Sequence, residues 1–146
     1  MKLKIHLLII IFCCISSCEL LPDHVYGIKI QNYSNDTIVF YANYSYPDTA
    51  IIADRPGLVM AYPQDYSYWD SKKKWEDVLP NDTISIFIFS KASINKFSWN
   101  DIKKNYIVLQ RYDISIKELK ALGSTFTYPP TGNMKNIKMY PSYKEK

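Results

Sequence analysis

The chain has 146 residues, with 18 lysines and arginines against 14 aspartates and glutamates and a formal net charge of +4. This length suits a single domain, and the charge bias is too weak to indicate a nucleic-acid partner. Three cysteines and two histidines leave little material for disulfides, thiol catalysis or histidine metal sites.

The first 18 residues have the pattern of a secretion signal. Two lysines lie near the start, and residues 7–15 form an unbroken apolar run that is too short to span a bilayer, which takes about 20 residues. Two serines then precede Cys18. This arrangement resembles the precursors of bacterial lipoproteins, and the resemblance implies cleavage before Cys18 and acylation of that cysteine. The alternative is an ordinary signal peptide, cut near Ser17, that leaves Cys18 as a free thiol.

Removal of residues 1–17 limits the chemistry left to the mature chain. Cys13 and Cys14 leave with the signal and Cys18 is consumed by its lipid, so the mature domain has no disulfide and no cysteine metal site. His24 is then the only histidine. Catalysis by a serine–histidine or cysteine–histidine pair would have to use that one residue. We therefore expect no cofactor, no metal and no catalytic residues of that kind.

Residues 18–24 are the expected lipidated cysteine and a short tether. Six extended residues span about 20 Å, so the domain should lie close to its membrane. Each buried methylene of a lipid contributes about 0.8 kcal/mol, so two or three acyl chains make a stable anchor.

The first half of the domain, which we expect over residues 25–140, is predicted to consist of strands. Residues 25–32 alternate between apolar and polar, and residues 37–44 are rich in β-branched and aromatic side chains. The turn residues between these two strands predict a hairpin. Residues 49–53 and 58–62 are candidates for short strands.

The middle of the chain combines its least regular and its most apolar stretches. Residues 63–82 lack a clear period, apart from a short helix that would carry Trp75. Residues 83–89 are apolar on both faces over most of their length, which is typical of a central strand. We therefore predict burial of five side chains there, namely Ile84, Ile86, Phe87, Ile88 and Phe89.

Two helix starts are predicted in the last third. Ser98 with Asp101 resembles a capping box, and Ser115 with Glu118 matches one. Residues 106–111 and 125–128 are predicted strands, residues 137–140 an edge strand, and residues 141–146 a frayed tail.

Several stretches resemble a group of small, uncharacterised lipoproteins of gut Bacteroidota. They are Tyr46-Pro47-Asp48-Thr49, the run from Leu79 to Phe89, the run from Leu109 to Ser115, Lys117-Glu118-Leu119 and Thr127-Tyr128-Pro129. The resemblance implies an outer-membrane lipoprotein but no activity. Surface-exported members often carry an acidic cluster after the cysteine, and here only Glu19 follows it directly. The periplasmic face is therefore favoured over the cell surface.

The expected fold is a β-rich α+β domain. It would have one antiparallel sheet or sandwich of about six to eight strands, with two or three short helices.

The expected function is a non-catalytic binding or structural role in the cell envelope, with the bilayer and an unidentified envelope protein or glycan as partners. The alternatives are a glycan-binding accessory lipoprotein and, less favoured, a hydrolase that uses two carboxylates across a cleft.

Aromatic residues make up 15% of the chain. Most are expected to pack in the sheets. Tyr66, Tyr68, Trp69 and Trp75 differ because they cluster, together with Tyr62, in an irregular polar stretch. Exposed rings there would make stacking surfaces for sugars or binding hot spots for proteins. We interpret them as candidate ligand-binding residues on one loop.

Three threonines are candidates for O-glycosylation, because Bacteroidota modify a hydroxyl that follows aspartate and precedes a small or aliphatic residue. They are Thr37, Thr49 and Thr83. Thr49 is favoured, since Pro47 should hold its loop outwards. Aspartate at turn ends and threonine at strand starts would also produce such tripeptides without any modification.

Overall fold

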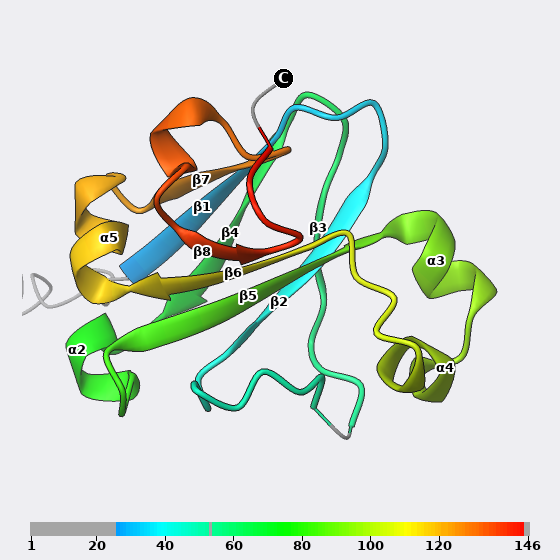
Figure 1. Ribbon diagram of the computed structural model, residues 1–146, viewed down its shortest axis with the longest axis horizontal. Helices are drawn as coiled ribbons and strands as arrows, with labels where there is room; N and C mark the ends of the chain where they lie inside the picture. The colour runs from blue at the N-terminus through cyan, green and yellow to red at the C-terminus, as the bar shows by residue number, and fades with distance from the viewer. Residues whose placement is uncertain (1–25, 53, 145–146) are drawn as a thin grey trace, which may run out of the picture.

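The computed structural model describes residues 26–52 and 54–144, and its strands form two sheets (Figure 1). The larger sheet is antiparallel throughout, with strand order β3-β2-β5-β6-β8. Its strands are β2 (Ile38–Asn43), β3 (Val59–Ala61), β5 (Thr83–Ser90), β6 (Gln110–Ser115) and β8 (Lys138–Tyr140).

The smaller sheet has strand order β4-β1-β7. Its strands are β1 (Tyr26–Asn32), β4 (Tyr66–Ser71) and β7 (Thr125–Tyr128). The central strand β1 runs antiparallel to β4 and parallel to β7. The chain thus pairs its first described strand with one that lies almost at its end.

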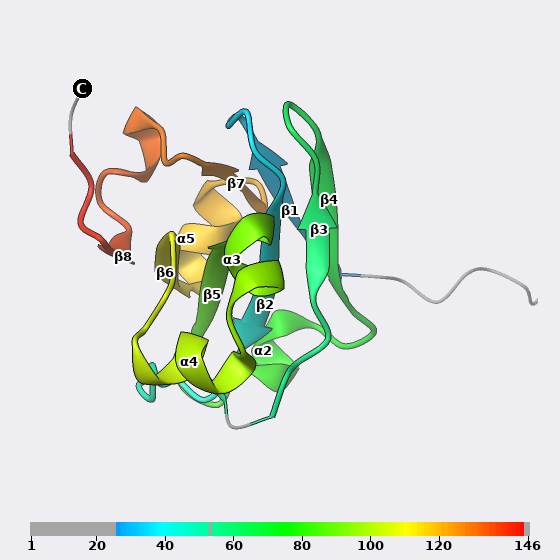
Figure 2. The same cartoon turned by 90° about the vertical axis from the view of Figure 1, so that its right-hand side faces the viewer.

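Short helices lie at both ends of the larger sheet. In Figure 1, α2 (Trp75–Val78) and α5 (Ile116–Ala121) lie at one end, and α3 (Lys91–Lys96) and α4 (Trp99–Lys104) lie at the other. Figure 2 shows α3 and α4 in front of the larger sheet, with β3 and β4 together at one side. A 3-10 turn, η1 (Gly132–Met134), follows β7.

These elements confirm a β-rich α+β domain, and the eight strands of the described residues lie within the expected six to eight. The finer expectation was wrong in three respects. There are two sheets instead of a single sheet or sandwich, and β1 and β7 are parallel. The described residues also hold four short α-helices, one more than the largest number expected.

Serine side chains start three of the helices. The Ser98 hydroxyl accepts a hydrogen bond from the Asp101 backbone N–H, and Ser115 and Glu118 form a complete capping box. Both starts confirm the sequence prediction. The helix α3 was not predicted, although Ser90 caps it by accepting from the Ser93 backbone N–H.

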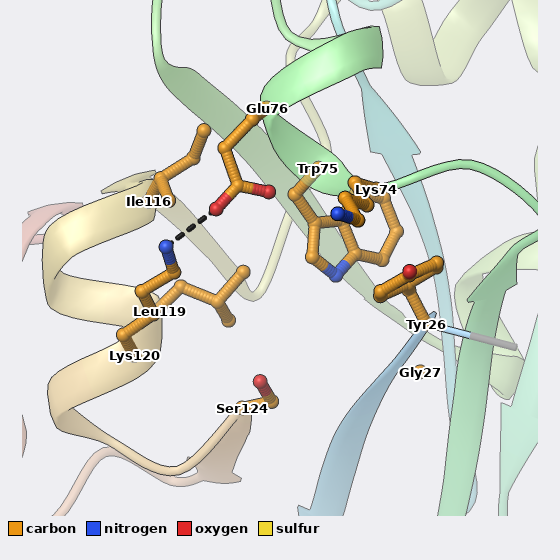
Figure 3. Close-up of a pocket in the computed structure, with 9 residues that line it drawn as sticks. All are labelled: Tyr26, Gly27, Lys74, Trp75, Glu76, Ile116, Leu119, Lys120 and Ser124. Carbon is orange, nitrogen blue, oxygen red and sulfur yellow. Dashed lines mark hydrogen bonds and ion pairs between the residues drawn. The ribbon is translucent and has the colours of Figure 1, made fainter. Parts of the chain in front are cut away.

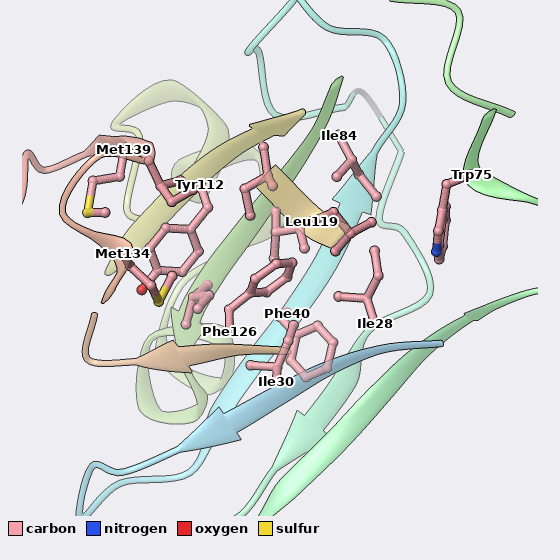
Figure 4. Packing of buried hydrophobic residues seen from close by; sticks show 14 of the residues in the cluster. Ile28, Ile30, Phe40, Trp75, Ile84, Tyr112, Leu119, Phe126, Met134 and Met139 are labelled. Atoms are coloured by element: carbon pink, nitrogen blue, oxygen red, sulfur yellow. The ribbon is translucent and has the colours of Figure 1, made fainter. Parts of the chain in front are cut away.

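The main core lies between the two sheets. Ile28 and Ile30 of β1 and Phe126 of β7 face the larger sheet, where Phe40 and Ile86 are fully buried. Figure 4 shows Ile28, Ile30, Phe40 and Phe126 in this cluster, with Trp75 at one end and Met134 and Met139 at the other.

The outer face of the larger sheet carries a second core. Phe87 and Phe89 point to this side, where Ile94 of α3 and Ile102 of α4 cover them. Successive residues of a strand point to opposite faces, so β5 buries both of its faces. All five side chains predicted to be buried in this strand are 0% exposed, which confirms that it is central.

The predicted hairpin of residues 25–32 and 37–44 is wrong. β1 and β2 belong to different sheets, and the turn between them carries the chain from one sheet to the other. The buried Asn32 amide stabilises this corner by donating to the carbonyls of Asp36, Ala61 and Tyr62. Turn residues favour a reversal of the chain but do not specify which strands then pair.

Other predicted elements also differ from those in the structure. Residues 49–52 form no strand, and the strand expected at 106–111 begins at Gln110 and continues to Ser115. The stretch 63–82, predicted to be irregular, contains the six-residue strand β4.

Candidate functional site

The predicted aromatic set lies on and after β4, and the strand separates its members. Residues of a strand alternate between faces, so Tyr66 and Tyr68 point away from the core whereas Trp69 points towards it. The two tyrosines are 48% and 47% exposed. Trp69 is half-buried, and its indole N–H donates to the Tyr44 hydroxyl at 2.7 Å.

Trp75 does not belong to the exposed surface. It is buried at the start of α2, in the main core, with its ring centroid 6.4 Å from that of Tyr44. The prediction that all four aromatic residues share one exposed loop is therefore wrong. Ligand binding by Tyr66 and Tyr68 stays a prediction.

Tyr66 and Tyr68 form a defined surface together with Lys29 of β1, and we call these three residues the aromatic platform. The ring centroids of the two tyrosines are 5.6 Å apart in an edge-to-face arrangement. The Lys29 ammonium lies 4.0 Å from the centroid of the Tyr66 ring, and Lys29 is directly opposite Tyr68 in the strand register. A cation over an aromatic face is attracted by the ring quadrupole.

Gly27 leaves the space that the Tyr68 ring occupies. A β-carbon at this glycine would lie 3.3 Å from the Tyr68 ring and 2.9 Å from the Asp70 carboxylate, so any side chain there would displace one of them. The missing side chain therefore lets Tyr68 lie against the backbone of β1. Sequence reasoning placed Gly27 and Lys29 on the polar face of their strand but could not pair them with residues so far along the chain.

A cavity of about 420 Å³ lies between the start of β1 and the helices α2 and α5 (Figure 3). Its apolar lining comes from Trp75, Ile116 and Leu119, whereas its charged lining comes from Lys74, Glu76 and Lys120; Tyr26, Gly27 and Ser124 complete it. Its size lies within the range of small-molecule sites.

An ion pair joins the two helices beside this cavity. Lys120 donates to the Glu76 carboxylate, and this hydrogen bond lowers the pKa of Glu76 below its usual value. Both side chains are largely exposed, and solvent screens the attraction between exposed charges. The pair can therefore separate at little cost when another charged group competes for it.

One carboxylate is buried on the outer face of the larger sheet. Asp113 accepts a hydrogen bond from the Ser85 hydroxyl at 2.8 Å and lies 3.2 Å from Arg111 Nε, and Lys138 approaches its other oxygen at 3.9 Å. These partners compensate the desolvation of the charge. Arg111 and Asp113 are two apart on one strand, a spacing that places both on one face.

The three candidate threonines for O-glycosylation are all half-buried in the structure. Thr37 directly precedes β2, Thr83 is the first residue of β5, and Thr49 lies in the connection between β2 and β3. Their modification stays a prediction. Cys18 lies outside the described residues.

Within residues 26–52 and 54–144, no group of three or more histidine, cysteine, aspartate or glutamate residues could hold a metal ion. In the same part of the chain, none of the helices has both the length and the apolar character needed to cross a membrane. The chain matches no protein-family model, no curated protein and no solved structure.

Proposed function

We propose that this chain is an envelope lipoprotein, anchored through an acylated Cys18, whose domain binds a glycan without chemically altering it. The aromatic platform is the binding surface. The proposed location is the periplasmic face of the outer membrane.

The observation that carries the proposal is the exposure of Tyr66 and Tyr68 on the outward face of β4. Nearly half of each side chain faces solvent, although both could have been replaced by polar residues at no loss to the core. Their partners Lys29 and Gly27 hold the rings in place before any ligand arrives. A preformed surface loses little conformational entropy on binding.

Sugar rings suit such a surface because they combine an apolar C–H face with hydroxyl groups at the rim. The Tyr68 ring offers a flat partner for the apolar face. The Gln31 amide and the Asp70 carboxylate lie on neighbouring outward positions of β1 and β4 and can bond with hydroxyl groups.

The test is a titration of the detergent-solubilised lipoprotein against a panel of envelope and dietary glycans. Tyr68→Ala should weaken binding about tenfold or more, as truncation of an aromatic hot spot does. Tyr140→Ala is the matched control, because this tyrosine is 52% exposed on the larger sheet. Unchanged affinity in Tyr68→Ala would contradict the proposed surface. Release of new reducing ends would contradict the non-catalytic role.

A further inference from the structure

The cavity between β1, α2 and α5 is separate from the aromatic platform, and its lining has the character of a site for an amphiphile. Trp75, Ile116 and Leu119 supply the apolar part and are each at least nine-tenths buried. Lys74, Lys120 and Glu76 supply two positive charges against one negative charge. A ligand that matches this lining has an apolar chain and an anionic head.

The place of the cavity in the fold indicates where such a ligand would come from. Tyr26 and Gly27 line it, and they are the first two residues of β1. Seven residues separate Tyr26 from Cys18, a distance of about 25 Å when fully extended. A domain anchored at Cys18 would therefore carry this cavity close to the lipid surface.

We propose that this cavity holds one acyl chain of an anionic membrane lipid. The chain would contact Trp75 and Leu119, and the lipid head would pair with Lys74 and Lys120. Lys120 is held by Glu76 in the free protein, so the head would compete for an exposed ion pair. The inference rests on the anchoring part of the proposed function and is independent of glycan binding.

The experiment uses the protein reconstituted in vesicles of phosphatidylglycerol or phosphatidylcholine with brominated acyl chains. Bromine quenches tryptophan fluorescence on contact. The chain has three tryptophans, so the double variant Trp69→Phe/Trp99→Phe leaves Trp75 as the only reporter. Circular dichroism of this variant verifies that it is folded, and if it is not, the quenching is measured by difference between the wild type and Trp75→Phe.

We expect strong quenching of Trp75 by brominated phosphatidylglycerol and at least tenfold weaker lipid binding in Lys120→Glu. Lys117→Glu is the matched control, since Lys117 lies on the same helix, is exposed and does not line the cavity. Equal losses in the two variants would indicate general surface attraction and overturn the proposal. Absence of quenching, or equal quenching by the zwitterionic lipid, would also overturn it.

The acyl chain in the cavity could come from a membrane lipid or from the lipid on Cys18 itself. The variant Cys18→Ala distinguishes these two sources, because it lacks the protein's own lipid. Quenching in both the lipidated protein and Cys18→Ala supports a membrane lipid as the ligand. Quenching seen only in Cys18→Ala would assign the cavity to the protein's own acyl chains and overturn the proposal. Loss of the anchor itself would appear in the intact mass, so failure of the proposed anchoring and failure of the lipid site remain distinguishable.

Discussion

Burial of the Tyr41 side chain makes the free energy of unfolding depend on pH in the alkaline range. Tyr41 is 0% exposed, and desolvation raises its pKa to about 12 from the ordinary value near 10. The unfolded chain therefore loses this proton at a lower pH than the folded one. The stabilisation is complete below pH 10 and is lost as the pH rises from about 10 to about 12, at up to about 1.4 kcal/mol per pH unit.

Replacing this tyrosine tests that dependence. Tyr41→Phe should reduce the steepness with which the free energy of unfolding falls between pH 10 and pH 12, because one buried ionisable group is gone. Denaturant titrations at several pH values measure the slope. Tyr62→Phe, at a residue that is 59% exposed, is the matched control. Equal slopes in Tyr41→Phe and the wild type would contradict the assignment.

The capping box of α5 is the clearest example of an element that the sequence specifies locally. Ser115→Ala removes the hydroxyl that accepts from the Glu118 backbone N–H and donates to the Glu118 carboxylate, whereas the bond from the Ser115 backbone N–H to that carboxylate remains. We expect a loss of about 1 kcal/mol in the free energy of unfolding. Ser142→Ala, at an exposed position outside any helix, is the control. A loss no larger than in this control would show that the box contributes nothing measurable.

The strand β5 should tolerate no charge on either face. Phe87→Asp places a carboxylate in the second core, beside Tyr41 and Tyr106. Arg111 lies opposite it on β6, but this cation already pairs with Asp113. An unpaired buried charge costs several kcal/mol, a large part of the stability of a small domain. We expect loss of the cooperative thermal transition in circular dichroism.

Phe97→Asp is the matched control, since Phe97 is 36% exposed at the end of α3. It should unfold close to the wild-type temperature. A normal transition in Phe87→Asp would mean that the strand is less central than the structure indicates.

The elements that were predictable share one property, which is that their signals are local. β5 is an apolar run, and α4 and α5 begin at a serine with an acidic residue three positions on. The helix α3 has a serine in that third position, at Ser93, so the acidic half of the signal is absent.

The elements that were missed depend on distant partners. β4 has the sequence Tyr66-Ser67-Tyr68-Trp69-Asp70-Ser71, and its alternation becomes visible only when β1 is placed beside it. The same holds for the candidate site. The two tyrosines were identified from the sequence. Their neighbours Lys29 and Gly27 were not, because they lie on a strand some forty residues earlier.

The attachment of the domain is tested at Cys18. Cys18→Ala should move the protein from the membrane fraction to the soluble fraction, or leave it as uncleaved precursor, because the acyl chains supply the anchoring free energy. Fractionation and the intact mass of the protein from its native host measure both outcomes. A mature wild-type chain that begins at an unmodified Cys18 would contradict the anchor. The same spectrum would reveal any glycan mass on the candidate threonines.

If the chain is exported from its N-terminus, as we propose, the pairing of β1 with β7 sets the order in which the two sheets form. Lys29 lies opposite Thr125, so nearly the entire domain separates two strands that must meet. Contacts so distant in sequence form late, because the loop between them must close first. In that case β1 would cross the membrane early, and it could pair with β7 only after nearly all of the domain had followed. Under the proposed export, the smaller sheet would therefore be completed only when translocation is nearly finished.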